Sequence, residues 1–286
     1  MPVTTLEHLR EWIGRSESRT ETLALEPVLA LAATFDLDGD AIASQPLPPL
    51  WHWLYFLPRA PQHTLGSDGH PTLGGFMPPV PLPRRMWAGG ELSFHRGLRV
   101  GDTVTKTSTI TDVQHKSGRT GELWFVTVDH VLSVDGDVAL KERHDIVYRA
   151  MPEVGQPQPP RPRLAQDAQF GRALQADPVM LFRFSALTFN AHRIHYDLDY
   201  VRDVEGYPGL IVHGPLQAML TLELLRAERP EAQVKRFGFR GLAPLFHQDT
   251  VTVGGRDDPE TAGRVQLWTG DDAGGQAMTA WAEVER

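Results

Sequence analysis

The sequence contains no cysteine. That absence excludes disulfide bonds, thiolate nucleophiles, iron–sulfur clusters and cysteine-ligated zinc. Positive charge is also in deficit, because the formal net charge is −8, whereas general nucleic-acid binders present an excess of Lys and Arg. We therefore expect no nucleic-acid partner.

Long hydrophobic runs are missing too. The most apolar early run, LALEPVLALAATF, is interrupted by Glu26 and Pro27 and is too short to cross a bilayer. The first residues, MPVTTLEHLREWIGRSE, lack the apolar core of a signal peptide. We expect a soluble cytoplasmic protein with no membrane contact. Its 41% hydrophobic residues are enough for a substantial core.

Residues 46–90 are dense in proline and glycine, which disfavours long helices and central strands there. The segments PLPPLWHWLYFLPRAP and GSDGHPTLGGFMPPVPLPRRMWAGG nonetheless contain aromatic residues that favour burial. We expect an ordered, aromatic-rich loop that covers another part of the protein. Before it, helical spacing of apolar residues predicts helices near residues 6–13 and over residues 20–35.

Residues 91–149 have the pattern of strands. ELSFHRGLR, DTVTKTSTITDVQ, ELWFVTVDHVLSV and DVALKERHDIVYR are separated by turn-like segments such as SGRTG and DGD. In the third of them Val126, Val128 and Leu132 share one face, as alternate residues of a strand do. The pattern predicts an antiparallel meander of long strands.

A repeated five-residue motif and a repeated order of predicted elements indicate an internal repeat. Residues 151–168, MPEVGQPQPPRPRLAQDA, are proline-rich and predict an extended linker between two halves, residues 1–150 and 169–286. GDTVT at residues 101–105 recurs as QDTVT at residues 248–252, each time after a strand that contains an aromatic residue and an arginine. The order of predicted elements recurs as well.

HGPLQAMLTLELL predicts a helix that is apolar on nearly every side, with Pro215 in its first turn. Such a helix is buried on nearly every side, which a long antiparallel sheet wrapped around it would satisfy. A short strand is expected earlier, near residues 179–185. The predicted fold is α+β, a double hot dog in which two long antiparallel sheets each wrap a central helix. In the first half, the segment PRRMWAGG replaces an obvious long central helix.

Three histidines lie close together in FNAHRIHYDLDYVRDVEGYPGLIVHGPL, at positions 192, 195 and 213. Their spacings come without an acidic ligand pattern, so we expect no metal site. Two interpretations stay open. Packed structural histidines fit His192 best. Acid–base catalysis fits His195 best, because imidazole titrates near neutral pH.

The same stretch resembles the MaoC-like dehydratases, in which an Asp five residues before a His precedes an (Ala/Val)-His-Gly helix start. FSALTFNAHRIHYDLDY and GYPGLIVHGPL are most similar to the branch of mesaconyl-C4-CoA hydratase, itaconyl-CoA hydratase and mitochondrial-type 3-hydroxyacyl-thioester dehydratase. DGHPTLGGFMPPVPLPRRMWAGG, LRVGDTV and ERHDIVYR extend the similarity over residues 50–245. The resemblance implies a hydro-lyase that adds water to an enoyl thioester, or removes it from a 3-hydroxyacyl thioester.

The resemblance also implies catalytic roles. His195 matches the catalytic histidine and would transfer the proton. Gly214 begins the helix whose free N–H groups would stabilise charge on the thioester oxygen. Asn190 stands where many relatives have the catalytic Asp, and because an amide does not titrate we expect it to orient water or the hydroxyl. His213 either shapes this oxyanion site or packs at the helix cap.

The first half shows no counterpart of this motif, so we expect it to be non-catalytic and to shape the acyl pocket. Arg84 and Arg85 either recognise a substrate carboxylate or coenzyme A phosphate, or anchor a loop through an ion pair. Trp87 is expected to line the pocket. The resembled branch favours a short branched dicarboxylic acyl-CoA, such as mesaconyl-C4-CoA or itaconyl-CoA. The alternative is a fatty-acid-type 3-hydroxyacyl thioester of CoA or of acyl carrier protein.

Two further function classes stay open. One is a hot-dog thioesterase, although Glu223 on the central helix is badly placed for it. The other is a non-catalytic acyl-CoA-binding module. No cofactor is expected, since the thioester supplies the activation. A double hot dog pairs its two halves internally, so the sequence allows both a monomer and a homodimer.

Overall fold

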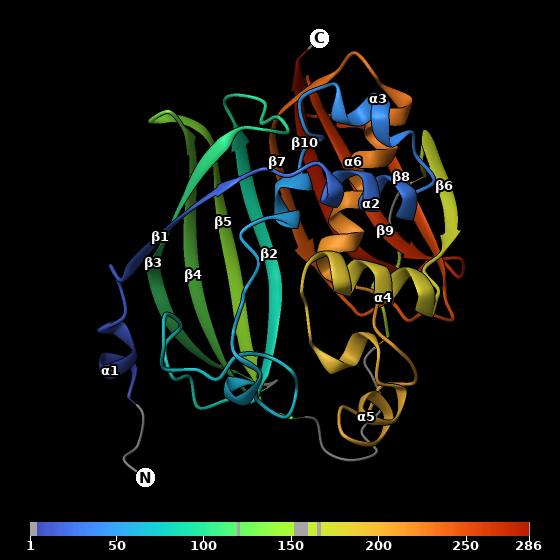
Figure 1. Cartoon of the computed structure of the whole chain (residues 1–286). Coiled ribbons are helices and arrows are strands. Elements are labelled where there is room, and N and C mark those ends of the chain that lie inside the picture. Colours follow the sequence, from blue (N-terminus) through green and yellow to red (C-terminus); the bar gives the residue numbers. More distant parts are fainter. Residues whose placement is uncertain (1–4, 119–120, 152–159, 165–166, 286) are drawn as a thin grey trace.

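Ten strands form one antiparallel sheet in the computed structural model (Figure 1), which describes residues 5–118, 121–151, 160–164 and 167–285. The elements of the first half are α1 (Leu6–Arg10), β1 (Ser16–Thr22), α2 (Glu26–Thr34), α3 (Gly39–Ala43), η1 (Trp51–Leu54), η2 (Gln62–Thr64), β2 (Arg84–Phe94), β3 (Thr103–Gly118), β4 (Gly121–Val134) and β5 (Asp137–Arg149). Those of the second half are β6 (Phe170–Gln175), α4 (Pro178–Leu187), η3 (Arg193–His195), α5 (Leu198–Asp203), α6 (Gly214–Glu228), β7 (Gln233–Gly241), β8 (Thr250–Asp257), β9 (Arg264–Asp271) and β10 (Gln276–Glu285).

The two halves of the sheet repeat one topology. Five strands follow the order β1-β3-β4-β5-β2, and the other five follow the equivalent order β6-β8-β9-β10-β7. Thr103 begins β3 and Thr250 begins β8. The two copies of the repeated motif, GDTVT and QDTVT, therefore lie at the start of equivalent strands. The double hot dog of the α+β class is confirmed.

The two five-stranded sheets are joined edge to edge, through pairing of β2 with β7, which the sequence did not predict. Two glycines in β2 permit the close approach of three strands. A Cβ on Gly89 would lie 2.5 Å from the carbonyl oxygen of Phe239, and one on Gly90 would lie 2.4 Å from that of Arg143. Any side chain at either position would therefore displace backbone.

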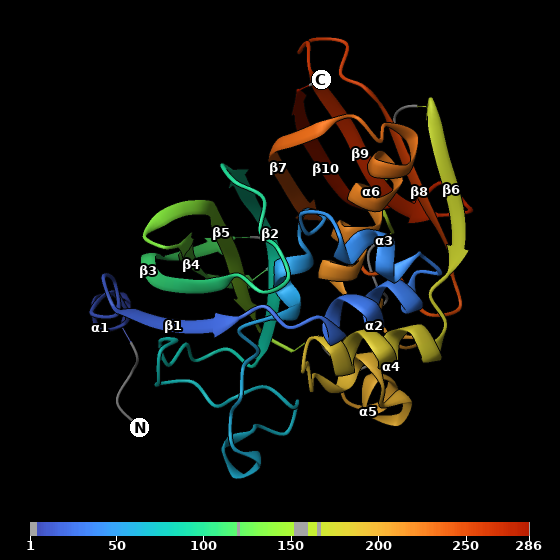
Figure 2. The ribbon, with the colours of Figure 1, turned by 45° about the horizontal axis from the view of Figure 1, so that its top comes forward.

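Helix α6 is the predicted central helix, and it lies across the second sheet (Figure 1). Residues 216–225 are all buried, including polar ones. In the first half the prediction of a central helix is corrected, because α2, with nine residues, is the longest helix in the described part of that half. Helix α2 packs beside α4 instead (Figure 2).

The proline-rich segment before β2 is ordered and covers the first sheet, as predicted. Val80 is buried in a cluster with Val126 and Tyr148, and Phe76 and Met77 pack against it. Further upstream, the aromatic residues around η1 belong to the main core. Rigid apolar side chains thus help to hold a long loop in place.

Two local predictions need correction. Residues 20–22 belong to β1, and helix α2 begins only at Glu26, with Pro27 in its first turn. Residues 179–185 form part of helix α4 rather than a strand, because Asp177 accepts the N–H of Met180 and caps the helix. A short apolar run fits either element until a cap decides it.

Residues 152–159 and 165–166 of the predicted linker lie outside the described residues. Its middle part is attached to the second sheet, where Arg161 pairs with Asp249 and, at 2.5 Å, with Asp271. No helix among the described residues is long and apolar enough to span a membrane.

Candidate active site

The loop between α4 and α5 carries the histidine motif. Phe189 adopts a left-handed φ of 49°, and the turned chain lets the N–H of Asn190 donate to the Ser185 carbonyl at 2.8 Å. The side-chain Oδ1 of Asn190 accepts the N–H of His192 at 3.0 Å. Asn190 therefore stabilises the loop with its amide oxygen. Asn190 also lines the cavity of the site.

His195 is buried at the end of η3. Its Nδ1 lies 2.7 Å from the carbonyl oxygen of Ile211, and because a carbonyl only accepts, Nδ1 carries the proton and Nε2 has a free lone pair. Nε2 has no hydrogen-bond partner among the described residues. Burial lowers the pKa of His195 to about 4, against the opposing effect of the Ile211 hydrogen bond. His195 is therefore a neutral base at neutral pH.

His213 lies directly behind His195. The two rings are stacked, with centroids 3.6 Å apart, and Nε2 of His213 is 2.8 Å from the Ser185 hydroxyl. Complete burial holds the pKa of His213 well below its usual range. Since His213 is not among the cavity-lining residues, the structure favours the packing interpretation, in which it supports the ring of His195.

Gly214 is the first residue of α6 and lines the cavity. A Cβ there would find only the Trp87 carbonyl oxygen, at 4.0 Å, so the space before the helix N-terminus is open. The first N–H groups of a helix have no intrahelical acceptor. The positive end of the dipole of α6 therefore faces this space, where it would stabilise an oxyanion.

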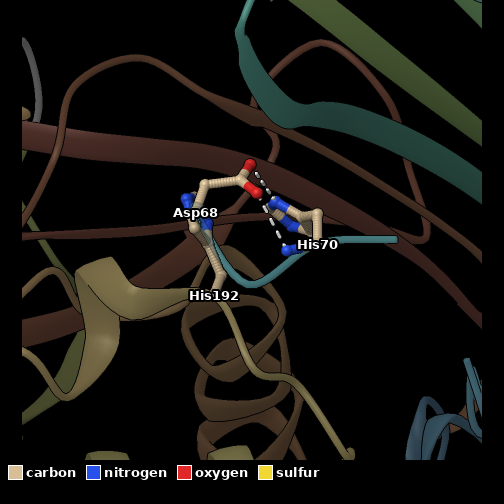
Figure 3. Close-up of side chains that lie close together, drawn as sticks. All are labelled: Asp68, His70 and His192. Atoms are coloured by element: carbon tan, nitrogen blue, oxygen red, sulfur yellow. Dashed lines mark hydrogen bonds and ion pairs between the residues drawn. The ribbon is translucent and has the colours of Figure 1, made fainter. Parts of the chain in front are cut away.

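A loop from the first half reaches the same site, which sequence reasoning missed. Asp68 and His70 lie on it, and the His70 ring is 4.1 Å from the ring of His192. Figure 3 shows the three side chains together. The Nδ1 of His70 is 2.9 Å from Oδ2 of Asp68. The available signal was an Asp-x-His spacing inside a loop too long for a mere connection.

Residues of both halves surround one cavity of about 1930 Å³, whose wall includes His70, Asn190, His195 and Gly214. That volume exceeds the roughly 300–1,000 Å³ typical of small-ligand pockets. The site therefore combines a free imidazole, a helix N-terminus and room for a large ligand such as an acyl thioester.

A family model for hydroxyacyl-thioester dehydratase type 2 matches residues 50–247. The chain belongs to this family. The matched range agrees with the resemblance over residues 50–245, and the predicted membership of the MaoC-like hydratases and dehydratases is confirmed.

Two relatives within the hydratases and dehydratases are similar to this chain over most of its length. It is 46% identical to mesaconyl-C(4)-CoA hydratase of Chloroflexus aurantiacus, over 96% of each chain. It is 30% identical to the mitochondrial hydroxyacyl-thioester dehydratase type 2 of Schizosaccharomyces pombe, covering 72% of this chain and 77% of the relative.

Solved structures support the fold of the family member. A MaoC-like dehydratase superposes with a TM-score of 0.72 at 17% identity, covering 97% of this chain and 99% of that one. A Mycobacterium tuberculosis protein described as a double hotdog fold superposes with a TM-score of 0.58 at 15% identity, covering 96% of each chain.

The two arginines of β2 differ in this dehydratase-family site. Arg84 is buried, its Nε lies 3.0 Å from a carboxylate oxygen of Glu205, and it donates to the Tyr207 hydroxyl. Its charge is thus already compensated, as in the loop-anchoring interpretation. Arg85 is half-buried, borders the cavity and forms no ion pair within the described residues. Of the two, Arg85 remains available to a ligand.

Trp87 lines the cavity as predicted. Its ring packs against His144 at 4.0 Å and Trp53 at 4.8 Å between centroids, and its Nε1 donates to the Gly89 carbonyl at 2.9 Å. The indole is therefore fixed by its neighbours and presents a rigid apolar surface.

We expect the low pKa of His195 to show in the pH dependence of activity. A base acts only when deprotonated, so its contribution to kcat/KM is present above its pKa and lost as the pH falls through about 4. The measurement is kcat/KM from pH 3.5 to 8, on enzyme shown to remain folded by circular dichroism. A His195-dependent decline centred near pH 6.5 would contradict this.

Proposed function

We propose that the protein is a hydratase that adds water to the double bond of an enoyl-CoA, most specifically of a short branched dicarboxylic acyl-CoA such as mesaconyl-C4-CoA or itaconyl-CoA. The observation that carries the proposal is the neutral His195, with Nε2 free, beside the open N-terminus of α6 at Gly214. The substrate class rests on the 46% identity to a protein named for mesaconyl-C(4)-CoA hydration.

The proposed chemistry uses each of these groups. Nε2 of His195 accepts a proton from water while the water oxygen bonds to the β-carbon. The π electrons move toward the thioester oxygen, whose negative charge the N–H of Gly214 and the dipole of α6 stabilise. Asn190 has its Oδ1 engaged with His192, so its amide N–H groups are the part that can hold the water or the product hydroxyl.

Arg85 is proposed as the partner of the second substrate carboxylate. Guanidinium binds carboxylate through two parallel hydrogen bonds, and Arg85 lines the cavity without an ion pair to another described residue. Arg84 is less suited, because Glu205 already neutralises it.

Replacing Arg85 with alanine should raise KM for dicarboxylic enoyl-CoA substrates about 10- to 100-fold, the scale of a lost hydrogen bond to a charged group of 1.5–3 kcal/mol. KM for crotonyl-CoA, which has no second carboxylate, should change little. Steady-state hydration kinetics with both substrates measure the difference. Equal increases for both would remove Arg85 from carboxylate recognition.

The alternative substrate is a 3-hydroxyacyl thioester of fatty-acid type, on CoA or acyl carrier protein. It is favoured by the 30% identity to the Schizosaccharomyces pombe dehydratase. A thioesterase is disfavoured, because Glu223 accepts from Trp51 at 2.8 Å and from Arg226 and does not border the cavity.

The testing experiment follows loss of enoyl-thioester absorbance with mesaconyl-C4-CoA, itaconyl-CoA, crotonyl-CoA and a medium-chain enoyl-CoA. Preference for the first two supports the dicarboxylic proposal. Preference for the medium chain supports the alternative. Release of free thiol would indicate a thioesterase, and binding without turnover of any substrate would indicate a binding module.

A further inference from the structure

The site lacks a titratable partner for His195 at position 190, since an amide neither takes nor gives a proton near neutral pH. Addition of water moves two protons, one off the water oxygen and one onto the α-carbon. With His195 assigned to the water, the α-carbon needs its own donor. The other side chains on the cavity wall are the place to look for it.

Four carboxylates of the described residues line the cavity, and three of them pair with arginine. The three pairs are Glu91–Arg236, Asp145–Arg143 and Glu205–Arg84. The fourth, Asp68, differs because its partner is an imidazole, that of His70. A carboxylate bound to arginine has a fixed charge beside it, whereas a carboxylate bound to imidazole supports a group that can exchange a proton.

The loop that carries Asp68 and His70 is attached to the histidine motif through the backbone. The N–H of Arg193 donates to the Asp68 carbonyl at 2.9 Å, and the guanidinium of Arg193 donates to the Ser67 carbonyl at 3.0 Å. Gly69 has a φ of 91°, and a Cβ on it would lie 1.9 Å from the Ala191 carbonyl oxygen. Glycine at this position lets the two chains touch.

Asp68 orients His70 with both oxygens. Oδ1 accepts the backbone N–H of His70 at 3.0 Å, and Oδ2 lies 2.9 Å from its Nδ1 (Figure 3). An ionised carboxylate only accepts, so Nδ1 carries a proton. Nε2 is then the reactive nitrogen, and it has no hydrogen-bond partner in the part of the chain that the structure describes.

We propose that Asp68 and His70 form a carboxylate–imidazole pair through which the first half of the chain supplies the acid–base group missing at Asn190, with His70 as a catalytic residue and Asp68 as its positioning residue. This inference rests on the proposed hydratase function. It replaces the expectation that the first half is non-catalytic.

The proton balance of the reaction assigns the two imidazoles. Water gives one proton to Nε2 of His195, and its oxygen bonds to the β-carbon. The electron pair of the double bond forms an enolate, which takes a proton from Nε2 of protonated His70 to make the new α-carbon–hydrogen bond. Solvent then removes the proton from His195 and returns one to His70, so the net addition is one water.

The environments of the two imidazoles agree with this assignment. His70 has a carboxylate partner that stabilises its imidazolium, whereas His195 has only a carbonyl. Burial lowers the pKa of both imidazoles and the charge of Arg85 lowers that of His70 further, but the hydrogen bond and charge of Asp68 oppose these effects at His70. The carboxylate partner therefore distinguishes His70 as the acid and leaves His195 as the base.

Asp68, His70 and His192 also place ligand atoms within 4.8 Å of one another, a distance that a bound cation would require. The geometry favours the hydrogen-bonded pair, because two ligand atoms about 2.0–2.2 Å from a tetrahedral metal lie roughly 3.4 Å from each other. Nδ1 of His70 and Oδ2 of Asp68 are 2.9 Å apart, which is a hydrogen-bond distance.

The test compares Asp68→Asn and His70→Gln with His63→Gln, an exposed histidine on the same segment. Asp68→Asn keeps an oxygen for the backbone N–H of His70 but removes the charge and turns an N–H donor toward Nδ1, so the amide no longer accepts the Nδ1 proton. With the best hydration substrate, both variants should lower kcat about 100-fold or more, with KM within a few-fold of wild type, and His63→Gln should retain full activity. Thermal unfolding checks that the variants are folded.

A second readout isolates the α-carbon step. Exchange of the α-hydrogen of the 3-hydroxyacyl-CoA product is followed by NMR in D2O. His195→Gln should retain this exchange while losing hydration, and His70→Gln should lose both. Exchange that survives in His70→Gln, or hydration within about 10-fold of wild type, a loss of only ~1.4 kcal/mol, would overturn the inference and leave the hydratase standing.

Two other results would also overturn the inference. Activity abolished by dialysis against a chelator and restored by a divalent ion would make the same side chains metal ligands. Absence of turnover by wild type with every member of the substrate panel would remove the proposed function, and the inference with it.

Discussion

Replacing His195 with alanine should lower kcat for hydration about 100-fold or more, the scale on which a general acid–base group contributes. The physical reason is that Nε2 of His195 has a free lone pair, fixed in direction by the hydrogen bond from Nδ1 to the Ile211 carbonyl. Without it, water must attack the β-carbon while keeping its proton. Single-turnover and steady-state kinetics on the best substrate measure the loss.

A second variant separates chemistry from packing at this position. His195→Gln can still donate to the Ile211 carbonyl and cover the ring of His213, but it cannot transfer a proton. It should therefore be as inactive as His195→Ala and fold like wild type. His8→Ala serves as the control, because His8 is half-exposed and lies in helix α1, far from residue 195 in the sequence. Activity within about 10-fold of wild type in both His195 variants would disprove the catalytic assignment.

Replacing Arg84 with methionine should lower the free energy of unfolding by about 3–5 kcal/mol, as expected when one partner of a buried ion pair is removed. The side chains of Arg84 and Glu205 are each only 6% exposed, so the remaining carboxylate would be left without its counter-charge. The pair joins β2 of the first half to the segment after α5 of the second. Urea unfolding measures the change.

The double variant Arg84→Met with Glu205→Leu provides the control, since an apolar pair of similar volume often substitutes for a buried ion pair at little cost. It should recover most of the lost stability. Because Arg84 is assigned to structure and Arg85 to the substrate, KM for a dicarboxylic substrate should change less in this double variant than in Arg85→Ala. A loss below about 1 kcal/mol in Arg84→Met would show that the pair contributes no more than a surface ion pair.

Patterns of short period were readable from the sequence alone. Alternation along β3, β4 and β5 and the apolar character of α6 predicted these elements nearly to their ends, because a strand or a buried helix imposes its period on neighbouring residues. The run at residues 179–185 was misassigned because seven apolar-rich residues fit a buried strand or a helix equally well. The cap at Asp177, outside the run, decided it.

The same limit applies to the candidate site. The motif around His195 and Gly214 was found because its residues lie within one continuous stretch that resembles a family. That stretch did not decide whether Arg84 and Arg85 bind a ligand or form an ion pair within the protein, since the partner of Arg84 is Glu205, more than a hundred residues away. The neighbours of a charged side chain, and not its identity, decide whether it binds protein or ligand.

The sequence by itself determined the double hot dog and the family, and it singled out His195 as the candidate catalytic histidine, because each depends on local periodicity or on a contiguous motif. Only the tertiary structure decided that β2 and β7 join the halves into one sheet, and that the loop with Asp68 and His70 meets His192. Both are contacts between residues more than a hundred positions apart. They follow from how the two halves pack, which no local pattern of residues records.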